Sequence, residues 1–219
     1  MAGLFGKLPA HGDFISRQLP QGFIQVWDEW LQCVVAGSRN QLGDSWLDYY
    51  LTSPVWRFAL RPGVVDESAW AGVLVPSVDS VGRYFPLTLA EQLPGQRDLF
   101  TFLAEDTDWF AAIEAVALAS LQQGLTADEV LEQLEQCQLA PQKTTSKVSG
   151  RGTVVLSGNR NSLFSGALPL VLQERSPYSL WASMENENAP AMSVVSTGLP
   201  TPDEYSSMIS GDWQETTVW

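Results

Sequence analysis

Residues 71–89, AGVLVPSVDSVGRYFPLTL, read as two β-strands joined by a polar loop, and the rest of the chain is organised around them. Val73–Val75 is a short continuous apolar run, which is typical of a strand buried on both faces. Pro76 ends that strand because proline has no N–H to give to a sheet. Gly82 favours a turn, since it adopts a positive φ without strain. The second strand is predicted over Tyr84–Leu89.

Asp79 and Arg83 place opposite charges in the loop of this hairpin. In one interpretation Arg83 pins the loop by hydrogen-bonding Asp79 and nearby carbonyls; in the other it binds a partner directly. Asp79, and Asp13 in the N-terminal loop, both lie near glycine and arginine. A carboxylate in that setting accepts backbone N–H and guanidinium bonds. We therefore expect both aspartates to hold loops rather than to perform chemistry.

The segments on either side of this hairpin predict one α/β domain over residues 1–219. Residues 22–36 and 108–123 each carry one apolar stripe at helical spacing, so each helix must bury one face. The pattern predicts a three-layer α/β/α sandwich around a mixed, mostly antiparallel sheet, with these two helices on opposite faces. The sheet is expected to include residues 55–61, 71–76 and 83–90. Other strands are predicted over 2–8, 153–156, 178–184 and 192–197.

Three further features complete the predicted organisation. Residues 141–152 (PQKTTSKVSGRG) are polar and rich in Ser, Thr and Gly, and we expect a mobile loop there. Thr126 and Glu129 match a capping box that begins a helix. Residues 164–173 are predicted to form a helix or an irregular apolar cover, and residues 202–209 a short terminal helix.

The charge of the chain excludes two classes of partner. The formal net charge is −13, and residues 98–142 hold nine acidic and no basic side chains. Nucleic acids and anionic membranes are bound through lysine and arginine, so neither is expected as a partner. The N-terminus has no signal-peptide pattern and no run is apolar enough to span a membrane, so we expect a cytoplasmic protein. Cys33 and Cys137 lack CxxC spacing and are expected as buried free thiols.

The sequence contains no recognisable catalytic motif. Its single histidine is His11, and an enzymatic site would need His11, Asp13 and Asp79 within hydrogen-bond reach of one another. No G-x-S-x-G elbow, Walker loop or dinucleotide fingerprint is present. We therefore expect neither catalysis nor a cofactor nor a metal. A small-molecule or anion-sensing domain stays open, if Lys7, Arg17, Arg57 and Arg83 converge on one pocket rather than each pairing with a carboxylate.

Several motifs along the chain resemble the TagF (also called ImpM) family of bacterial type VI secretion-associated proteins. They are Gly6-Lys7-Leu8-Pro9, Gly12-Asp13-Phe14, Trp56-Arg57-Phe58, Val75-Pro76-Ser77-Val78-Asp79, Val81-Gly82-Arg83, Phe85-Pro86-Leu87-Thr88, Ser179-Leu180-Trp181 and Gly198-Leu199-Pro200. The resemblance covers nearly the whole chain and is weakest over residues 98–150. Ala182 departs from the family pattern, which often has a second tryptophan there.

The resemblance implies a regulator rather than an enzyme. Members of the family are cytoplasmic, post-translational repressors of type VI secretion that act on a forkhead-associated (FHA) scaffold protein. Some relatives are fused to a Ser/Thr phosphatase domain, which implies a functional link to a kinase–phosphatase circuit. No catalytic residues come with the resemblance.

We expect the partner to be bound by a mixed-charge surface on the two loops. Its predicted residues are Lys7, Asp13, Arg17, Ser77, Asp79 and Arg83. Such side chains contribute little apolar area to a core, so packing alone does not explain their concentration in two loops. In this interpretation the acidic helical segment 98–138 mainly keeps the protein soluble. The alternative is that all these charges pair internally and another face binds the partner.

Overall fold

The computed structural model describes residues 1–95, 97–140, 146–149, 153–156, 177–184 and 191–213. Its strands are β1 (Gly3–Gly6), β2 (Ile15–Arg17), β3 (Trp56–Leu60), β4 (Trp70–Val75), β5 (Leu87–Gln92), β6 (Ser146–Ser149), β7 (Thr153–Leu156), β8 (Tyr178–Ser183) and β9 (Met192–Thr197). Its helices are α1 (Gln21–Leu42), α2 (Trp46–Thr52), α3 (Leu99–Glu105), α4 (Thr107–Gln122), α5 (Ala127–Leu134) and α7 (Pro202–Ser210), with a 3-10 turn at Gly43–Ser45.

Seven of the described strands form one sheet in the order β2-β1-β5-β4-β3-β8-β9. All pairings between its neighbouring strands are antiparallel. The predicted meander of three successive strands is confirmed as β3-β4-β5. The sheet is thus antiparallel rather than mixed. β6 and β7 form a separate two-stranded sheet.

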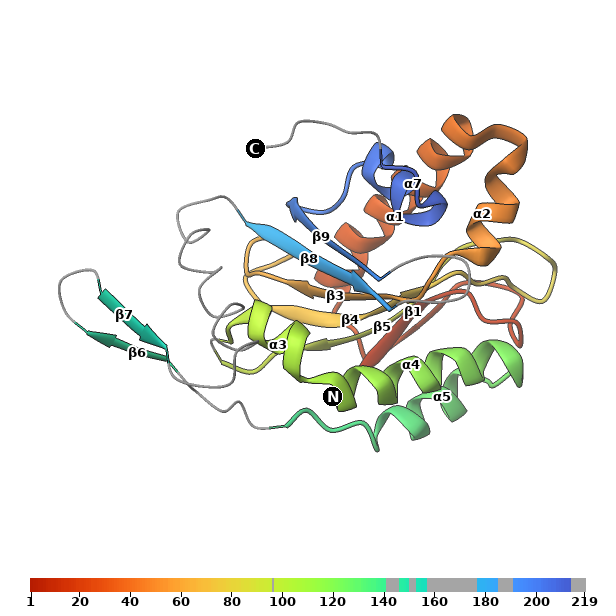
Figure 1. Cartoon of the computed structure of the whole chain (residues 1–219). Coiled ribbons are helices and arrows are strands. Elements are labelled where there is room, and N and C mark those ends of the chain that lie inside the picture. The colour runs from red at the N-terminus through yellow and green to blue at the C-terminus, as the bar shows by residue number, and fades with distance from the viewer. Residues whose placement is uncertain (96, 141–145, 150–152, 157–176, 185–190, 214–219) are drawn as a thin grey trace.

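The predicted three layers are confirmed (Figure 1). One apolar core lies between the sheet and α1, α2 and α7, and a second lies between the sheet and α3, α4 and α5. The two helices predicted for opposite faces, α1 and α4, belong to different cores. A strand with helices on both faces must be apolar on both, and β4 is buried at every residue.

Aromatic rings fill the core beneath α1. Trp27 packs against Phe23, Phe58 and Trp181, with ring centroids 4.9–6.2 Å apart. Its indole N–H donates to Thr88 Oγ1 at 2.8 Å, so the polar edge of the ring is satisfied inside the core. This contact ties α1 to β5, the strand that leads out of the central loop.

Several predicted boundaries were wrong. The second hairpin strand begins at Leu87 rather than Tyr84, because residues 77–85 close a loop in which the Phe85 N–H donates to the Ser77 carbonyl. Helix α3 was not predicted; Asp98 caps it by accepting from the N–H groups of Phe100 and Thr101. Strand β6 lies inside the range expected as a mobile loop, whose other residues fall outside the described ranges, as does the predicted segment 164–173.

The cysteines are free, but they are not buried as predicted: Cys33 is exposed and Cys137 is half-buried. Cys33 lies roughly a third of a turn from the centre of the buried stripe of α1, which Phe23, Trp27, Leu31 and Val34 define. The apolar character of cysteine therefore did not determine on which face of α1 Cys33 lies.

A buried ion pair joins the middle of the sheet to α4. Arg57 on β3 donates from Nε and Nη2 to the two carboxylate oxygens of Glu114, at 2.6 and 2.7 Å. The side chains of Arg57 and Glu114 are only 8% and 16% exposed. Phe110 lies beside the guanidinium, with its ring centroid 5.3 Å from Cζ. Such a bidentate pair fixes the position of α4 along the sheet.

We expect Glu114→Ala to lower the free energy of unfolding by about 3 kcal/mol, because Arg57 would keep a buried charge without its partner. Urea unfolding followed by tryptophan fluorescence measures this change. The double variant Arg57→Met/Glu114→Leu should recover most of the loss, since an apolar pair leaves no buried charge.

Glu132→Ala, an exposed glutamate on α5, is the matched control and should change the unfolding free energy little. Equal effects of Glu114→Ala and Glu132→Ala would contradict the proposed role of the ion pair.

Candidate functional site

Two loops meet at one end of the sheet: loop A, residues 7–14 between β1 and β2, and loop B, residues 76–86 between β4 and β5. β1 and β5 are neighbours, so the loops that follow β1 and precede β5 lie side by side. Gly6 ends β1 with φ 133°, and a Cβ there would lie 2.1 Å from the Pro86 carbonyl oxygen. Only glycine allows the two chains to approach this closely. We call the two segments the paired loops.

Asp79 is the centre of the paired loops. Its Oδ2 accepts from Lys7 Nζ and from Arg83 Nε, both at 2.7 Å. Its Oδ1 accepts from the backbone N–H groups of Val81 and Arg83, at 3.0 and 2.8 Å. The Asp79 side chain is fully buried, and the Lys7 side chain is only 5% exposed. One side chain of loop B therefore holds a cation of loop A and shapes the turn of loop B.

Two opposing effects set the pKa of Asp79. Burial favours the neutral acid, but the hydrogen bonds from Lys7, Arg83 and Val81 outweigh it and hold the pKa well below its usual range. The carboxylate therefore stays ionised at any physiological pH. The hydrogen bonds of Arg83 to Asp79 and to the Gly12 carbonyl are those expected if Arg83 pins the loop.

Hydrogen bonds to backbone carbonyls also join the two loops. Ser77 Oγ donates to the Lys7 carbonyl at 2.6 Å, and the Ser80 N–H donates to the His11 carbonyl at 2.9 Å. Arg83 Nη2 donates to the Gly12 carbonyl. Each of these bonds runs from loop B to a backbone oxygen of loop A, so the two loops form a single unit.

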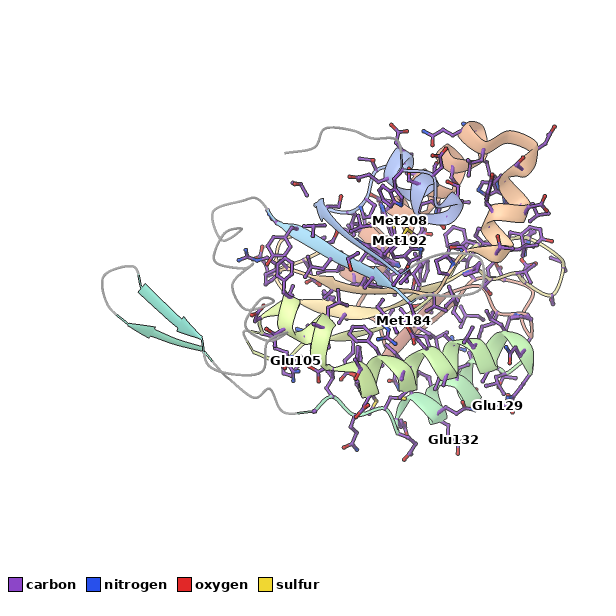
Figure 2. The ribbon with its side chains drawn as sticks, viewed as in Figure 1. Glu105, Glu129, Glu132, Met184, Met192 and Met208 are labelled. Atoms are coloured by element: carbon purple, nitrogen blue, oxygen red, sulfur yellow. The ribbon has the colours of Figure 1, made fainter. Side chains whose placement is uncertain are left out.

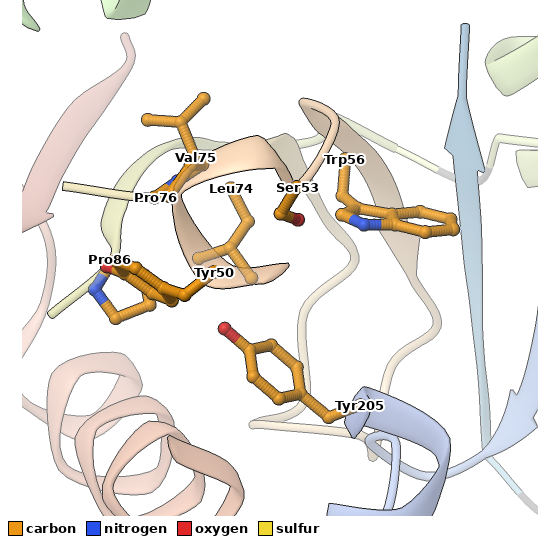
Figure 3. Close-up of a pocket in the computed structure, with 8 residues that line it drawn as sticks. All are labelled: Tyr50, Ser53, Trp56, Leu74, Val75, Pro76, Pro86 and Tyr205. Atoms are coloured by element: carbon orange, nitrogen blue, oxygen red, sulfur yellow. The ribbon is translucent and has the colours of Figure 1, made fainter. Parts of the chain in front are cut away.

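Tyr50 on α2 supports the paired loops from behind. Its hydroxyl donates to the Ser77 carbonyl and accepts from the Ser77 N–H, both at 2.9 Å. Burial, with the neighbouring Tyr205 next in importance, raises the pKa of the Tyr50 hydroxyl well above its ordinary value. Tyr50 and Tyr205 line a small cavity with Trp56 (Figure 3). Its volume of about 10 Å³ is room for about one water molecule, so it is not a substrate pocket.

The tip of the paired loops exposes both apolar and charged groups. Val81 is 67% exposed and Phe14 is 46% exposed. Phe14 packs edge-to-face on the buried Phe85, with centroids 4.8 Å apart, which fixes its ring at the surface. The Arg83 side chain is 56% exposed although its Nε is bound to Asp79. Sequence reasoning missed Phe14 and Val81, because nothing in the pattern separates an exposed apolar loop residue from a buried one.

Helix α5 contacts loop A and the strand that follows it. His11 Nε2 accepts from the Ala127 N–H at 3.0 Å. Arg17 Nε lies 3.7 Å from Asp128 Oδ1. The capping box predicted at the start of α5 is confirmed, with Thr126 and Glu129 bonding reciprocally.

The structure places the six predicted contact residues in two groups. Lys7, Ser77 and Asp79 are buried at 3–5% exposure and hold the loops together. Asp13, Arg17 and Arg83 are exposed at the surface. The four cations that could have formed an anion pocket each meet a carboxylate: Lys7 and Arg83 meet Asp79, Arg57 meets Glu114, and Arg17 meets Asp128.

No catalytic arrangement joins His11, Asp13 and Asp79. Asp13 accepts from the N–H of Phe14, while His11 and Asp79 have the separate partners given above. Within the described ranges no group of three or more His, Cys, Asp and Glu side chains is placed to hold a metal ion. Over the same ranges, no helix combines the length and apolar character needed to cross a membrane.

Comparison with known proteins identifies the family. A family model for the TagF N-terminal domain, which is type VI secretion system-associated, matches residues 3–137. The chain belongs to the TagF family. The crystal structure of PA0076 from Pseudomonas aeruginosa PAO1 is similar to this chain with a TM-score of 0.83 and 32% identity, covering 100% of this chain and 98% of PA0076. No curated protein matches the chain.

The TagF match includes both paired loops and α5. Thus the cluster around Asp79 lies within the family domain, whereas β8, β9 and α7 lie beyond residue 137. The likeness to PA0076 extends over those later elements as well.

We expect Asp79→Asn to lower Tm by several degrees, on the order of 5 °C at pH 7, because Lys7 and Arg83 lose their shared anion. The pKa of Asp79 is lower in the folded than in the unfolded chain. Its contribution to stability is therefore complete above about pH 5 and is lost progressively as pH falls below that value. The Tm difference between wild type and Asp79→Asn should narrow between pH 6 and pH 3.

Asp13→Asn is the matched control, since Asp13 is exposed and, among the described residues, accepts only from the Phe14 N–H. It should change Tm little at any pH in this range. A Tm difference for Asp79→Asn that stays constant down to pH 3 would show that the charge of Asp79 does not hold the loops.

Proposed function

We propose that this TagF-family protein is a cytoplasmic, post-translational repressor of the type VI secretion system, and that it binds an FHA scaffold protein of the apparatus through the tip of its paired loops. The observation that carries the proposal is the Asp79 cluster. It joins two loops of the family domain, and these loops expose Phe14, Val81 and Arg83. His11, Asp13 and Asp79, the residues considered for an enzymatic site, each bond to other groups.

The rigidity of the tip favours a binding role. A surface that is already ordered loses less conformational entropy on association than a flexible one. Arg83 is held at Nε and Nη2, so its remaining N–H groups point in a set direction. An exposed phenylalanine, Phe14, and an oriented guanidinium offer apolar area and charge, and aromatic residues and arginine are both enriched at protein interfaces.

The six residues predicted from sequence then take two roles in the proposal. Lys7, Ser77 and Asp79 position the loops, while Asp13, Arg17 and Arg83 are available to the scaffold. The acidic helix α5 carries charge outward, and Figure 2 shows Glu129 and Glu132 projecting from α5 away from the sheet. Those glutamates keep the protein soluble and do not form the interface.

The anion-sensing alternative has less support. A phosphate or small anion needs cations that converge on one pocket, whereas the four candidate cations pair with three different carboxylates, those of Asp79, Glu114 and Asp128. The link to a Ser/Thr kinase–phosphatase circuit therefore enters the proposal through the scaffold rather than through a phosphate site on this chain.

Val81→Asp tests the proposed interface. The substitution leaves the backbone N–H of residue 81 free to donate to Asp79, so the loop should keep its shape while the tip gains a negative charge. We expect scaffold affinity to fall at least about ten-fold, equivalent to about 1.4 kcal/mol, measured by titration calorimetry with the purified scaffold. In cells, the same variant should release secretion that wild-type protein represses.

Leu118→Asp is the matched control, because it makes the same change at an exposed leucine of α4. It should bind the scaffold as wild type does, and both variants should show wild-type circular dichroism. Loss of binding with Leu118→Asp but not with Val81→Asp would place the interface on the helical face. Absence of scaffold binding by the wild type would refute the proposed function itself.

A further inference from the structure

The two edges of the sheet differ in how they are protected from pairing with another strand. β2 is three residues long, carries the exposed Arg17, and leads into Gln18 with φ 58° and then Pro20. Short length, charge and proline are the usual devices that prevent edge-to-edge pairing. β9, at the other edge, is six residues long and reads MSVVST, without charge or proline. One edge is thus blocked and the other is open within the described residues.

Exposed apolar side chains gather at the β9 edge. Val195 on β9 is 52% exposed, and Trp213 is 39% exposed. Trp213 reaches back to β9, where its indole N–H donates to Met192 Sδ at 3.3 Å. With Val195 and its neighbours it lines an open groove of about 350 Å³ along the strand. An uncovered apolar strip beside an unpaired strand is typical of a surface that accepts a further strand.

The distribution of charge favours a second copy of this chain as the occupant. The net charge of −13 would oppose self-association if it faced the contact, but its densest part lies elsewhere. Acidic helix α5 contacts β1 and β2, at the opposite edge of the sheet. Figure 1 accordingly shows α4 and α5 at a distance from β9, on the face of the sheet opposite α1 and α7. Close to β9, the Glu204 carboxylate is already bonded by Ser196 Oγ and the Thr201 N–H.

We propose that β9 is a homodimerisation edge, at which two copies pair antiparallel across a two-fold axis centred on Val195 and join their sheets into one. An antiparallel pair of identical strands satisfies two-fold symmetry, and a neutral strand brings no like charges opposite each other. In this register Val195 lies opposite Val195 of the second copy, and Ser193 lies opposite Thr197. The two exposed valines then cover each other.

Light scattering on the purified full chain tests the dimer. The mass should rise with protein concentration from 24.1 kDa toward twice that value, and the rise should be stronger at high salt, which screens the repulsion between the two acidic copies. Val195→Lys should weaken the dimer at least ten-fold, whereas Leu118→Lys, at an exposed position of α4, should not. A wild-type chain that stays monomeric at its highest soluble concentration overturns the proposal, even if β9 then pairs with another protein.

Cysteine cross-linking tests the register, in a Cys33→Ser/Cys137→Ser background that removes both native thiols. Val195→Cys should form a disulfide-linked dimer under mild oxidation. Ser193→Cys should not, because in this register the two copies of residue 193 lie much farther apart than the about 7 Å between Cα atoms that a disulfide can span. Equal cross-linking at positions 193 and 195 would overturn the two-fold pairing centred on Val195.

Discussion

The shape of the candidate site depends on one buried carboxylate. The Asp79 carboxylate accepts hydrogen bonds from two cationic side chains and two backbone N–H groups, and these donors come from both loops. A buried charge is tolerable only when its partners are complete, so each partner is required by the others. The conformation of loop B and the position of Lys7 in loop A are therefore set together. That coupling lets residues about 70 positions apart in sequence act as one surface.

The rest of the fold serves to hold this cluster in place. Two cores on opposite faces of the sheet make β4 and β5 an interior hairpin, and the paired loops emerge from its end. Tyr50 from one layer bonds Ser77, and Ala127 from the other layer bonds His11. Both helical layers thus contact the paired loops, whereas the β9 edge lies at the far side of the sheet. A scaffold at the loops and a second copy at β9 would occupy separate surfaces.

Much of the architecture could be predicted because local chemistry decides it. The capping box at Thr126 follows from two side chains three residues apart, and β4 follows from an apolar run that proline ends. Burial of individual residues could not be predicted in the same way. Lys7 is interior because Asp79 lies opposite it, and Cys33 is exposed because the stripe of α1 faces elsewhere. Both facts depend on which segments become neighbours, which a single local pattern does not contain.

Hydrogen exchange at the Ser80 amide measures directly whether Asp79 holds the two loops as one unit. This N–H donates to the His11 carbonyl in loop A and is not one of the four groups that donate to the Asp79 carboxylate. In native-state hydrogen exchange, we expect Asp79→Asn to speed exchange at Ser80 together with Val81 and Arg83, while amides of β4 and β5 stay protected. Faster exchange at Val81 and Arg83 with unchanged protection at Ser80 would contradict this expectation, because the loops would then be joined without the carboxylate.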